Sequence, residues 1–171
     1  MSAYLGYLCV FKGRPYAVDN TGRTITVGLG PDDSTVQLVA QSLVGGGVIK
    51  FLVESKGDLL LADAYDRKFD DDDIKRVRID VYKLNVKEKK WAKLANLGDR
   101  VLFLGSLGSF SASASASDLC VPKGNCVIIM DNIFTRVYRE ITIFDLENGR
   151  LLPLTDYPEY LKLFKPPPKG I

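Results

Sequence analysis

The sequence predicts an all-β fold, specifically a partial β-propeller of about three four-stranded blades. Three observations lead to this prediction. Few segments of the 171 residues have helical spacing, and apolar or alternating runs recur between turn signals. Residues that favour tight turns separate many of these runs in pairs. Segments of similar sequence also recur along the chain, as expected of repeated blades.

Short turns are predicted to join neighbouring strands at three places. "RPYAVD" and "RTITVGL" flank "NTG", "KFLVES" and "DLLLADA" flank "KG", and "EITIFDL" and "RLLPL" flank "ENG". Each pair should form a hairpin, because Gly and Asn adopt the backbone angles that such turns need. The N-terminal "AYLGYLCVF" is too short for a membrane span and lacks the basic leader of a signal peptide, so we expect a buried strand there.

A repeat sets the expected blade boundaries. Similar segments start at Ile25, Ile79 and Ile141, and by subtraction these starts lie 54 and 62 residues apart. Each segment has a β-rich run, a polar turn and a second apolar run, which suits blades with insertions in their loops. We therefore expect one partial propeller domain over 1–171. Its blades should lie at approximately 3–44, 45–98 and 99–156, followed by an extended Pro-rich tail at 165–171.

The strands of each blade can be expected in order. The first blade begins with "YLGYLCVF", and the second contains "VIKFLVES", "DLLLADA", "RVRIDVYKL" and "KWAKLA". The third contains "SFSASAS", "CVIIMD", "REITIFDL" and "RLLPL". The acidic run "DRKFDDDD" then falls in a solvated loop of the second blade, because like charges at that density repel one another. Such a loop is a better explanation of this run than a metal site.

The run "SFSASASAS" at 109–117 is predicted to be the innermost strand of the third blade. Alternation puts its serines on one face and its alanines on the other. We expect the serines to meet water in the channel and the alanines to allow close packing between blades. Leucine at Ala112 or Ala114 should then overpack the fold, while changes of single serines should matter less. A catalytic serine is disfavoured, since the chain has no histidine and no GxSxG elbow.

Composition narrows the possible chemistry. The 23 basic and 21 acidic residues leave a net charge of +2, which gives no sign of nucleic-acid binding. The absence of histidine removes the usual general base and the usual zinc ligand. Cys9, Cys120 and Cys126 have no metal-ligand spacing and indicate reduced, mostly buried thiols inside a cell. The one disulfide worth testing is Cys120–Cys126, across a hairpin.

Several segments resemble one known family. These are "FKGRPYAVDNTGRTITV", "KFLVESKGDLLLADAY", "KKWAKLANLGDRVLFLG", "SFSASASASDLCVPKGNCVIIMDN" and "IFDLENGRLLPL". Together they are similar to the plant F-box-associated β-propeller family, catalogued as domain of unknown function 295, from about Phe11 to Pro168. The resemblance implies a propeller that selects proteins for ubiquitination. An F-box in the same protein would dock to the Skp1-like adaptor of a cullin (SCF-type) ligase.

Two features of the chain depart from the family pattern. About ten residues precede "FKGRPYAVD", and they contain no leucine-rich helical F-box. The family's earlier blades also have no counterpart in the sequence, and a ring of three blades would not close. We therefore expect a recognition module that needs further blades or a partner. A truncated product with no autonomous function is the alternative that these departures leave open.

The candidate site residues each have a structural and a functional interpretation. Asp19, Asp63 and Asp131 end corresponding second strands and could gather on one rim as a metal or acid–base site, although capping of Asx turns is the favoured interpretation. Trp91 is expected to pack between blades rather than to bind a partner. Exposed loops carry the residues expected to bind a target protein: Arg67, Arg136, Tyr138 and Arg139.

The function predicted from the sequence is protein recognition without covalent chemistry. We expect no cofactor, no metal and no catalytic residue, and no nucleic acid or membrane as a partner. The alternative from another class is a small-ligand-binding or hydrolytic propeller that uses the three carboxylates of the rim. The cytoplasm or the nucleus is the expected location, with an organelle not excluded.

Overall fold

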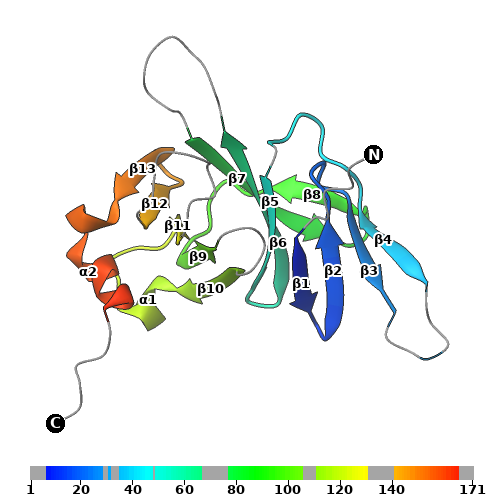
Figure 1. Ribbon diagram of the computed structural model, residues 1–171, viewed down its shortest axis with the longest axis horizontal. Helices are drawn as coiled ribbons and strands as arrows, with labels where there is room; N and C mark the ends of the chain where they lie inside the picture. Colours follow the sequence, from blue (N-terminus) through cyan, green and yellow to red (C-terminus); the bar gives the residue numbers. More distant parts are fainter. Residues whose placement is uncertain are drawn as a thin grey trace.

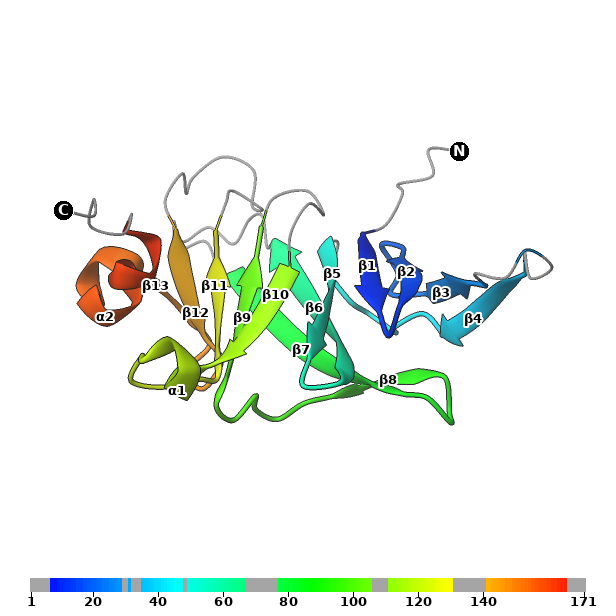
Figure 2. The same cartoon turned by 90° about the horizontal axis from the view of Figure 1, so that it is seen from below.

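The structure is a computed structural model, and it describes residues 7–28, 31, 35–47, 49–66, 77–105, 111–130 and 141–165. Three β-sheets lie side by side along the molecule (Figures 1 and 2). The first sheet has the strand order β1-β2-β3-β4, the second β5-β6-β7-β8 and the third β10-β9-β11-β12-β13. This arrangement confirms the prediction of an all-β, partial propeller fold.

The strand bounds follow the chain in order. The first sheet contains β1 (Leu8–Phe11), β2 (Arg14–Val18), β3 (Thr24–Val27) and β4 (Val36–Ala40). The second contains β5 (Ile49–Ser55), β6 (Asp58–Asp66), β7 (Val77–Asn85) and β8 (Lys90–Lys93). The third contains β9 (Arg100–Leu104), β10 (Ser111–Ser115), β11 (Cys126–Ile129), β12 (Thr142–Asp145) and β13 (Arg150–Pro153).

Short helices accompany the third sheet. They are α1 (Ala116–Leu119), η2 (Leu154–Asp156), α2 (Pro158–Leu161) and η3 (Lys162–Phe164). The side chain of Ser115 accepts a hydrogen bond from the amide of Asp118, which caps the start of α1. Within the described ranges, no helix has the length and apolar character to cross a membrane.

The three predicted hairpins are confirmed. β2 pairs with β3, β5 with β6 and β12 with β13, in each case antiparallel. The "KG" turn shows why its residues matter: Lys56 and Gly57 have φ angles of 51° and 79°. Positive φ at both central residues is the mark of a type I′ turn, whose twist matches that of the strands it joins.

The repeat corresponds to equivalent strands. The segments that start near Ile25, Ile79 and Ile141 form β3–β4, β7–β8 and β12–β13, which are the last two strands of the three sheets. The three similar segments therefore occupy the same position in the strand order of their sheets. The limits of the blades as independent units stay a prediction, as does the tail, most of which lies outside the described residues.

The third sheet corrects the predicted strand order. No strand was predicted at "RVLFL", but these residues form β9, which lies between β10 and β11. β9 pairs antiparallel with β10 and parallel with β11, so the sheet has five strands. The parallel partner was missed because turn residues identify hairpins and not pairings between distant segments.

Apolar side chains form one layer on each side of the second sheet and one beyond the third. The layer between the first and second sheets includes Phe11, Val18, Leu61 and Trp91. The layer between the second and third sheets includes Phe51, Val53, Leu60, Ile79, Val81, Leu102, Val127 and Phe144. The layer beyond the third sheet joins Val101, Ile128 and Ile143 to Leu154 and Tyr160 of the C-terminal segment.

Candidate functional site

The serine run contacts the neighbouring sheet. The hydroxyl of Ser111 donates a hydrogen bond to the carbonyl oxygen of Leu52 at 2.6 Å, and the hydroxyl of Ser113 donates to that of Glu54 at 2.8 Å. Leu52 and Glu54 lie on β5, the edge strand of the second sheet, and β10 is the edge strand of the third. Both serines are half-buried, and their hydrogen bonds to the neighbouring sheet were not predicted. Small hydroxyl side chains let the two edges approach and join.

The alanines of the run differ in their surroundings, since Ala116 is buried in the layer beyond the third sheet and the other two are not. Ala112 and Ala114 are half-buried and belong to none of the three apolar layers. Ser117, just after the strand, donates a hydrogen bond to the carboxylate of Asp99 at 2.7 Å. Ser109 and Phe110 lie outside the described residues. The described serine hydroxyls of this run thus take part in structural hydrogen bonds.

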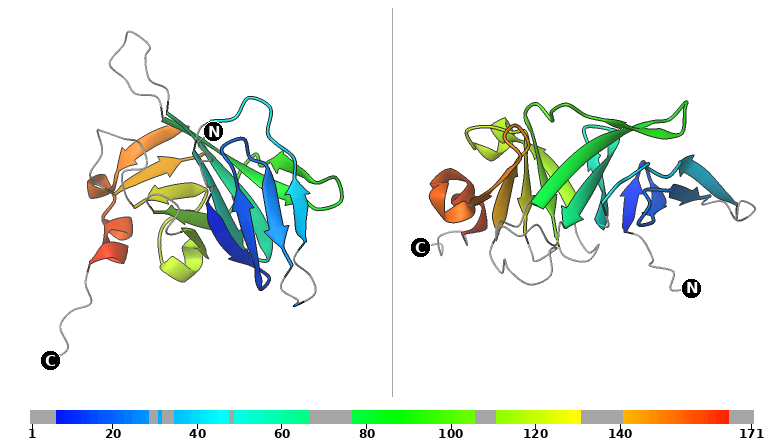
Figure 3. Two further views of the ribbon diagram at one scale, coloured as in Figure 1. Left: turned by 45° about the vertical axis from the view of Figure 1, so that its right-hand side comes forward. Right: turned by 90° about the horizontal axis from the view of Figure 1, so that it is seen from above.

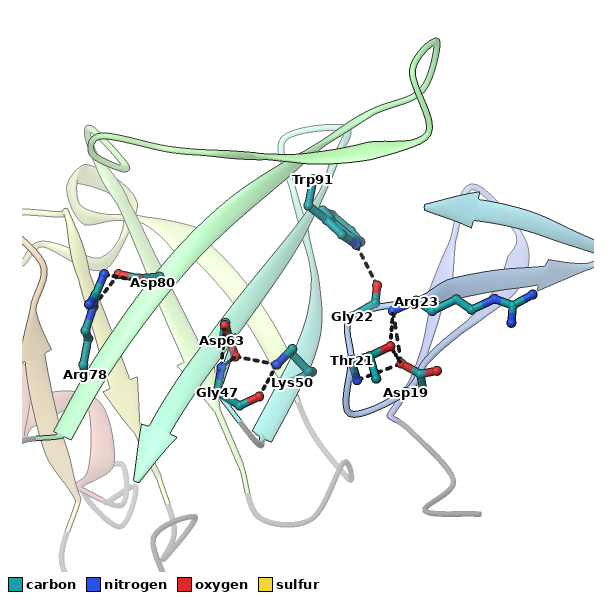
Figure 4. Close-up of polar contacts among 10 residues, drawn as sticks. All are labelled: Asp19, Thr21, Gly22, Arg23, Gly47, Lys50, Asp63, Arg78, Asp80 and Trp91. Atoms are coloured by element: carbon teal, nitrogen blue, oxygen red, sulfur yellow. Dashed lines mark hydrogen bonds and ion pairs between the residues drawn. The ribbon is translucent and has the colours of Figure 1, made fainter. Parts of the chain in front are cut away.

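Asp19 caps a turn, as predicted. Its Oδ1 accepts hydrogen bonds from the amide of Thr21 at 2.8 Å, from the hydroxyl of Thr21 at 2.6 Å and from the amide of Arg23 at 3.1 Å (Figure 4). These bonds hold the "NTG" turn between β2 and β3 in an Asx arrangement. The carboxylate of Asp19 is therefore committed to local structure.

Asp63 has a role that the sequence analysis did not foresee. It lies within β6, and its Oδ1 is 2.8 Å from Nζ of Lys50 on β5, with side-chain exposures of 0% and 1%. Its two carboxylate oxygens also accept from the amide of Gly47, each at 3.1 Å (Figure 4). The Asx-turn interpretation is wrong for this residue. A buried charge needs a partner, and Lys50 supplies it.

The "GGG" stretch closes over this ion pair. The ammonium of Lys50 donates to the carbonyl oxygen of Gly47. A Cβ atom on Gly47 would lie 2.4 Å from the carbonyl oxygen of Ala64, so no larger residue fits there without a shift. This close approach explains the glycine at this position by packing.

The predicted carboxylate rim does not assemble from the described residues. Asp19 and Asp63 belong to different sheets and have separate partners, and Asp131 lies outside the described residues. Across the described ranges, no three Cys, Asp or Glu side chains gather in a way that could hold a metal ion. The alternative of a small-ligand site required the three carboxylates to meet at one rim, and the two described ones do not meet.

A second group of polar residues lies on β7 and β8. Oδ2 of Asp80 is 2.8 Å from Nη2 of Arg78, and Oδ1 is 3.4 Å from Nζ of Lys93. Asp80 and Lys93 line a cavity of about 440 Å³ together with Leu94, Asn96, Leu97 and Leu146.

The neighbouring strand β6 carries Tyr65. Burial raises the pKa of Tyr65, and the charge of Asp63 adds to this rise. The i, i+2 spacing of Arg78 and Asp80 was the signal that could have revealed their pairing.

Trp91 packs between sheets, as predicted. It is 8% exposed and belongs to the layer between the first and second sheets. Its Nε1 donates a hydrogen bond to the carbonyl oxygen of Gly22 at 2.9 Å (Figure 4). A buried indole N–H needs such an acceptor. This hydrogen bond connects β8 to the turn between β2 and β3.

The three cysteines are free thiols, so the disulfide considered for Cys120 and Cys126 is not formed. Cys126 is buried, and its burial raises the pKa of the thiol to about 11. Cys9 is half-buried and Cys120 is exposed, so the expectation of mostly buried thiols was wrong. A raised pKa keeps Cys126 protonated and a poor nucleophile.

The role of four loop residues in binding a target protein stays a prediction. Arg67, Arg136, Tyr138 and Arg139 lie outside the described residues, as does most of the acidic run that follows Asp66. In the sequence, Arg67 directly follows β6, and the other three lie between β11 and β12. Figure 3 shows the three sheets from two further sides.

Comparison with known proteins gives the family context. The KIB1-4 beta-propeller family model matches residues 4–145. The chain is 36% identical to F-box protein SKIP23 of Arabidopsis thaliana, over 95% of this chain and 44% of that protein. It is 33% identical to F-box protein At2g17036 of the same plant, over 96% of this chain and 44% of that protein.

A third relative, putative F-box protein At5g60060 of Arabidopsis thaliana, is 39% identical over 62% of this chain and 29% of that protein. The chain thus spans less than half the length of the curated relatives described here. No solved structure matches.

Proposed function

We propose a function from the premise that this chain belongs to the KIB1-4 β-propeller family. The protein acts as a recognition module that binds and positions a target protein through the loops at its blade edges. It carries out no covalent chemistry of its own. The observation that carries this proposal is the family match together with the relatives' designation as F-box proteins.

The geometry of the polar residues supports a binding role over a catalytic one. The described hydroxyls of the serine run and the carboxylates of Asp19 and Asp63 are engaged in hydrogen bonds or ion pairs that hold the fold. Nucleophilic catalysis needs a nucleophile, a base and donors aimed at the developing charge. A rigid scaffold with variable loops suits recognition instead.

The proposed partners follow from the F-box relatives. A target protein binds the propeller, and a ubiquitin ligase modifies it when an F-box in the same protein docks to a Skp1-like adaptor. The propeller needs no cofactor, and neither nucleic acid nor membrane is among its partners. We place this activity in the cytoplasm or the nucleus, where a Skp1-like adaptor would be met.

Capture of proteins from plant extract tests the proposal. The wild-type chain is compared with a variant that carries Arg67→Ala, Arg136→Ala, Tyr138→Ala and Arg139→Ala. We expect at least one protein to be retained by the wild type and lost with the variant, because interface side chains supply most of the binding energy. A control with Lys87→Ala, Lys90→Ala and Lys162→Ala removes the same number of positive charges from exposed positions and should retain it.

Two results would count against different parts of the proposal. If the quadruple variant retains every protein that the wild type retains, the loop residues are not the binding site. If the wild type retains no protein above the background of an unrelated β-protein, the recognition function itself is rejected.

A further inference from the structure

Strand β7 extends beyond β8, its neighbour at the outer side of the second sheet. The strand pairing joins residues 82–85 to β8. One further hydrogen bond runs from the amide of Leu94 to the carbonyl oxygen of Val81 at 2.8 Å. Within the described ranges, no strand pairs with residues 77–80 on that side. We call residues 77–80 of β7 the open edge.

The open edge presents backbone groups for hydrogen bonding. The N–H and C=O groups of one residue point to the same side of an antiparallel strand, and successive residues alternate between the two sides. Val81 accepts from Leu94 on the β8 side, so Val77 and Ile79 also point to that side. Backbone groups at a strand edge are a template for the pairing of another chain.

A cavity lies against the open edge. The chain leaves β7 after Leu94, and the amide of Leu97 donates to Oδ1 of Asn125 in the third sheet's direction at 2.8 Å. The cavity of about 440 Å³ is lined by Ile79 on β7, by Leu97 and by Leu146 after β12. Ligand sites in proteins have volumes of roughly 300–1,000 Å³. The open edge therefore has room beside it for a further stretch of chain.

Two kinds of side chain border the cavity. Ile79, Leu97 and Leu146 belong to the apolar layer between the second and third sheets. Asp80 and Lys93 also line the cavity, and Nζ of Lys93 is 3.4 Å from Oδ1 of Asp80. Successive side chains of a strand point to opposite faces of its sheet. A strand added to the open edge would therefore place alternate side chains beside apolar and beside charged residues.

The charged side of the cavity has an excess of positive charge. Asp80 pairs with both Arg78 and Lys93, so two cations share one carboxylate (Figure 4 shows Arg78 and Asp80). The side chain of Asp80 is 9% exposed, whereas those of Arg78 and Lys93 are 47% and 53% exposed. The charge that reaches solvent is therefore positive, and it is complementary to an acidic side chain.

One buried acceptor of this group also lacks a donor. Nη2 of Arg78 is 2.8 Å from Oδ2 of Asp80, but this contact does not have the geometry of a hydrogen bond. No other residue of the described part of the chain donates to Oδ2. Buried polar atoms in proteins nearly always have a hydrogen-bond partner. An N–H group of a ligand in the cavity would supply one.

The position of the open edge restricts its occupant. β7 belongs to the middle sheet, and the two faces of this sheet pack on the first and third sheets. A further sheet stacked beyond the first or the third sheet would not reach the edge of the middle one. The open edge is therefore suited to an extended segment and not to another blade.

We propose that an extended segment of the target protein, with alternating acidic and apolar side chains, binds as an added strand at the open edge of β7. Its backbone pairs with Val77 and Ile79. Its apolar side chains enter the cavity, and its acidic ones lie beside Arg78 and Lys93. In strand addition, backbone hydrogen bonds provide affinity and side-chain pockets provide specificity. This inference rests on the proposed recognition function and names the chemistry of the partner.

Titration of the full chain with a synthetic peptide, followed by nuclear magnetic resonance, tests the proposal. The probe is an end-capped peptide of alternating glutamate and valine residues. We expect saturable binding with a Kd on the order of 0.1–1 mM, because the paired edge is short and the contact small. The amide resonance of Ile79 should shift, because its N–H gains an acceptor.

Matched controls distinguish strand addition from general attraction. Lys93→Glu should weaken binding at least about tenfold, because it sets like charges against each other. Lys90→Glu, at an exposed position on the same strand, should change the Kd less than about twofold. A peptide N-methylated on the side that faces β7 should not bind, because it has lost the backbone donors. Far-UV circular dichroism checks that each variant is folded.

Three results would overturn the inference. If the N-methylated peptide binds as tightly as its parent, backbone pairing is not the mode of binding. If the peptide binds only after residues 67–76 are replaced by a short Gly–Ser linker, the occupant is this chain's own segment. If the peptide does not bind while the wild type still retains proteins from plant extract, the open edge is rejected and the proposed function is not.

Discussion

The first and third sheets differ in how many of their faces are buried. In the third sheet, every residue of β11 and β12 is buried, because one face packs on the second sheet and the other on the C-terminal segment. In the first sheet, β1 buries one residue of its four and β2 one of its five. Since burial of apolar surface supplies most of the stability, two sheets of similar strand length contribute unequally. The first sheet should open more readily than the third.

A few specific contacts hold the first sheet in place. Nε1 of Trp91 donates to Gly22, and the amide of Gln41 donates to the carbonyl oxygen of Lys89 at 2.9 Å. Where the chain passes from the first sheet to the second, Gly47 and the buried pair of Lys50 and Asp63 fix the backbone. The first sheet thus combines one apolar layer with a few polar contacts, where the third is packed on both faces.

The strongest test of this comparison removes one buried ring from the third sheet. Phe144→Ala should lower the free energy of unfolding by about 3–5 kcal/mol, because the side chain is 2% exposed and its loss leaves a cavity. Leu8→Ala in the first sheet should stay within about 0.5 kcal/mol. Urea denaturation measures both. Equal losses would mean that the two sheets do not differ in the way their burial indicates.

The next test concerns the buried ion pair. Asp63→Asn leaves Lys50 charged and buried without its partner, and we expect a loss of about 3 kcal/mol in the same measurement. Asp58→Asn is the control, since Asp58 forms partly exposed pairs with Lys83 and Arg100 and should cost less than about 1 kcal/mol. If both substitutions cost the same, burial is not what makes the Asp63 pair important.

A smaller effect is expected when the tryptophan anchor is weakened. Trp91→Phe keeps an aromatic ring but leaves the carbonyl oxygen of Gly22 without its donor, at a cost of about 1–3 kcal/mol. Hydrogen exchange should then quicken in β2 and β3 while β11 and β12 keep their protection. Uniform loss of protection in all three sheets would contradict a local role for this contact.

The smallest effect is expected at the joined edges of β5 and β10. Ser111→Ala removes the bond to Leu52 and should cost about 1 kcal/mol. Ala112→Leu, at a half-buried position outside the apolar layers, should cost less. Thermal melts of the two variants decide the matter. A larger loss for the leucine variant would restore the packing role first predicted for the alanines.

Local patterns in the sequence were sufficient to predict most of the strands and the three hairpins. Alternation and turn residues predicted the four strands of the second sheet, and the structure has them at the expected places. Trp91 was also assigned correctly, because a large apolar residue at the start of an outer strand needs a buried surface.

Contacts between distant segments were not predictable in the same way. The parallel pairing of β9 with β11 leaves no turn signature. The register of the "KG" hairpin sets Lys50 opposite Asp63, but the segments that bury this pair are not apparent from the hairpin alone. The repeat identified equivalent strands but not which face each sheet turns to its neighbour. Ile79 and Val81 lie in the layer between the second and third sheets, whereas Ile25 is half-buried and Val27 is exposed on the first sheet.

The parallel pairing in the third sheet has a consequence for the order of events during folding. In the β5–β6 hairpin, Ser55 pairs with Asp58, so the chain closes a loop of very few residues. For β9 and β11, Val101 pairs with Cys126, 25 residues apart by subtraction. A longer loop costs more entropy to close, and non-local pairs form later. Pulse-labelled hydrogen exchange should therefore find amides of β6 protected before those of β11. The fully buried strand β11 would then be among the last to form.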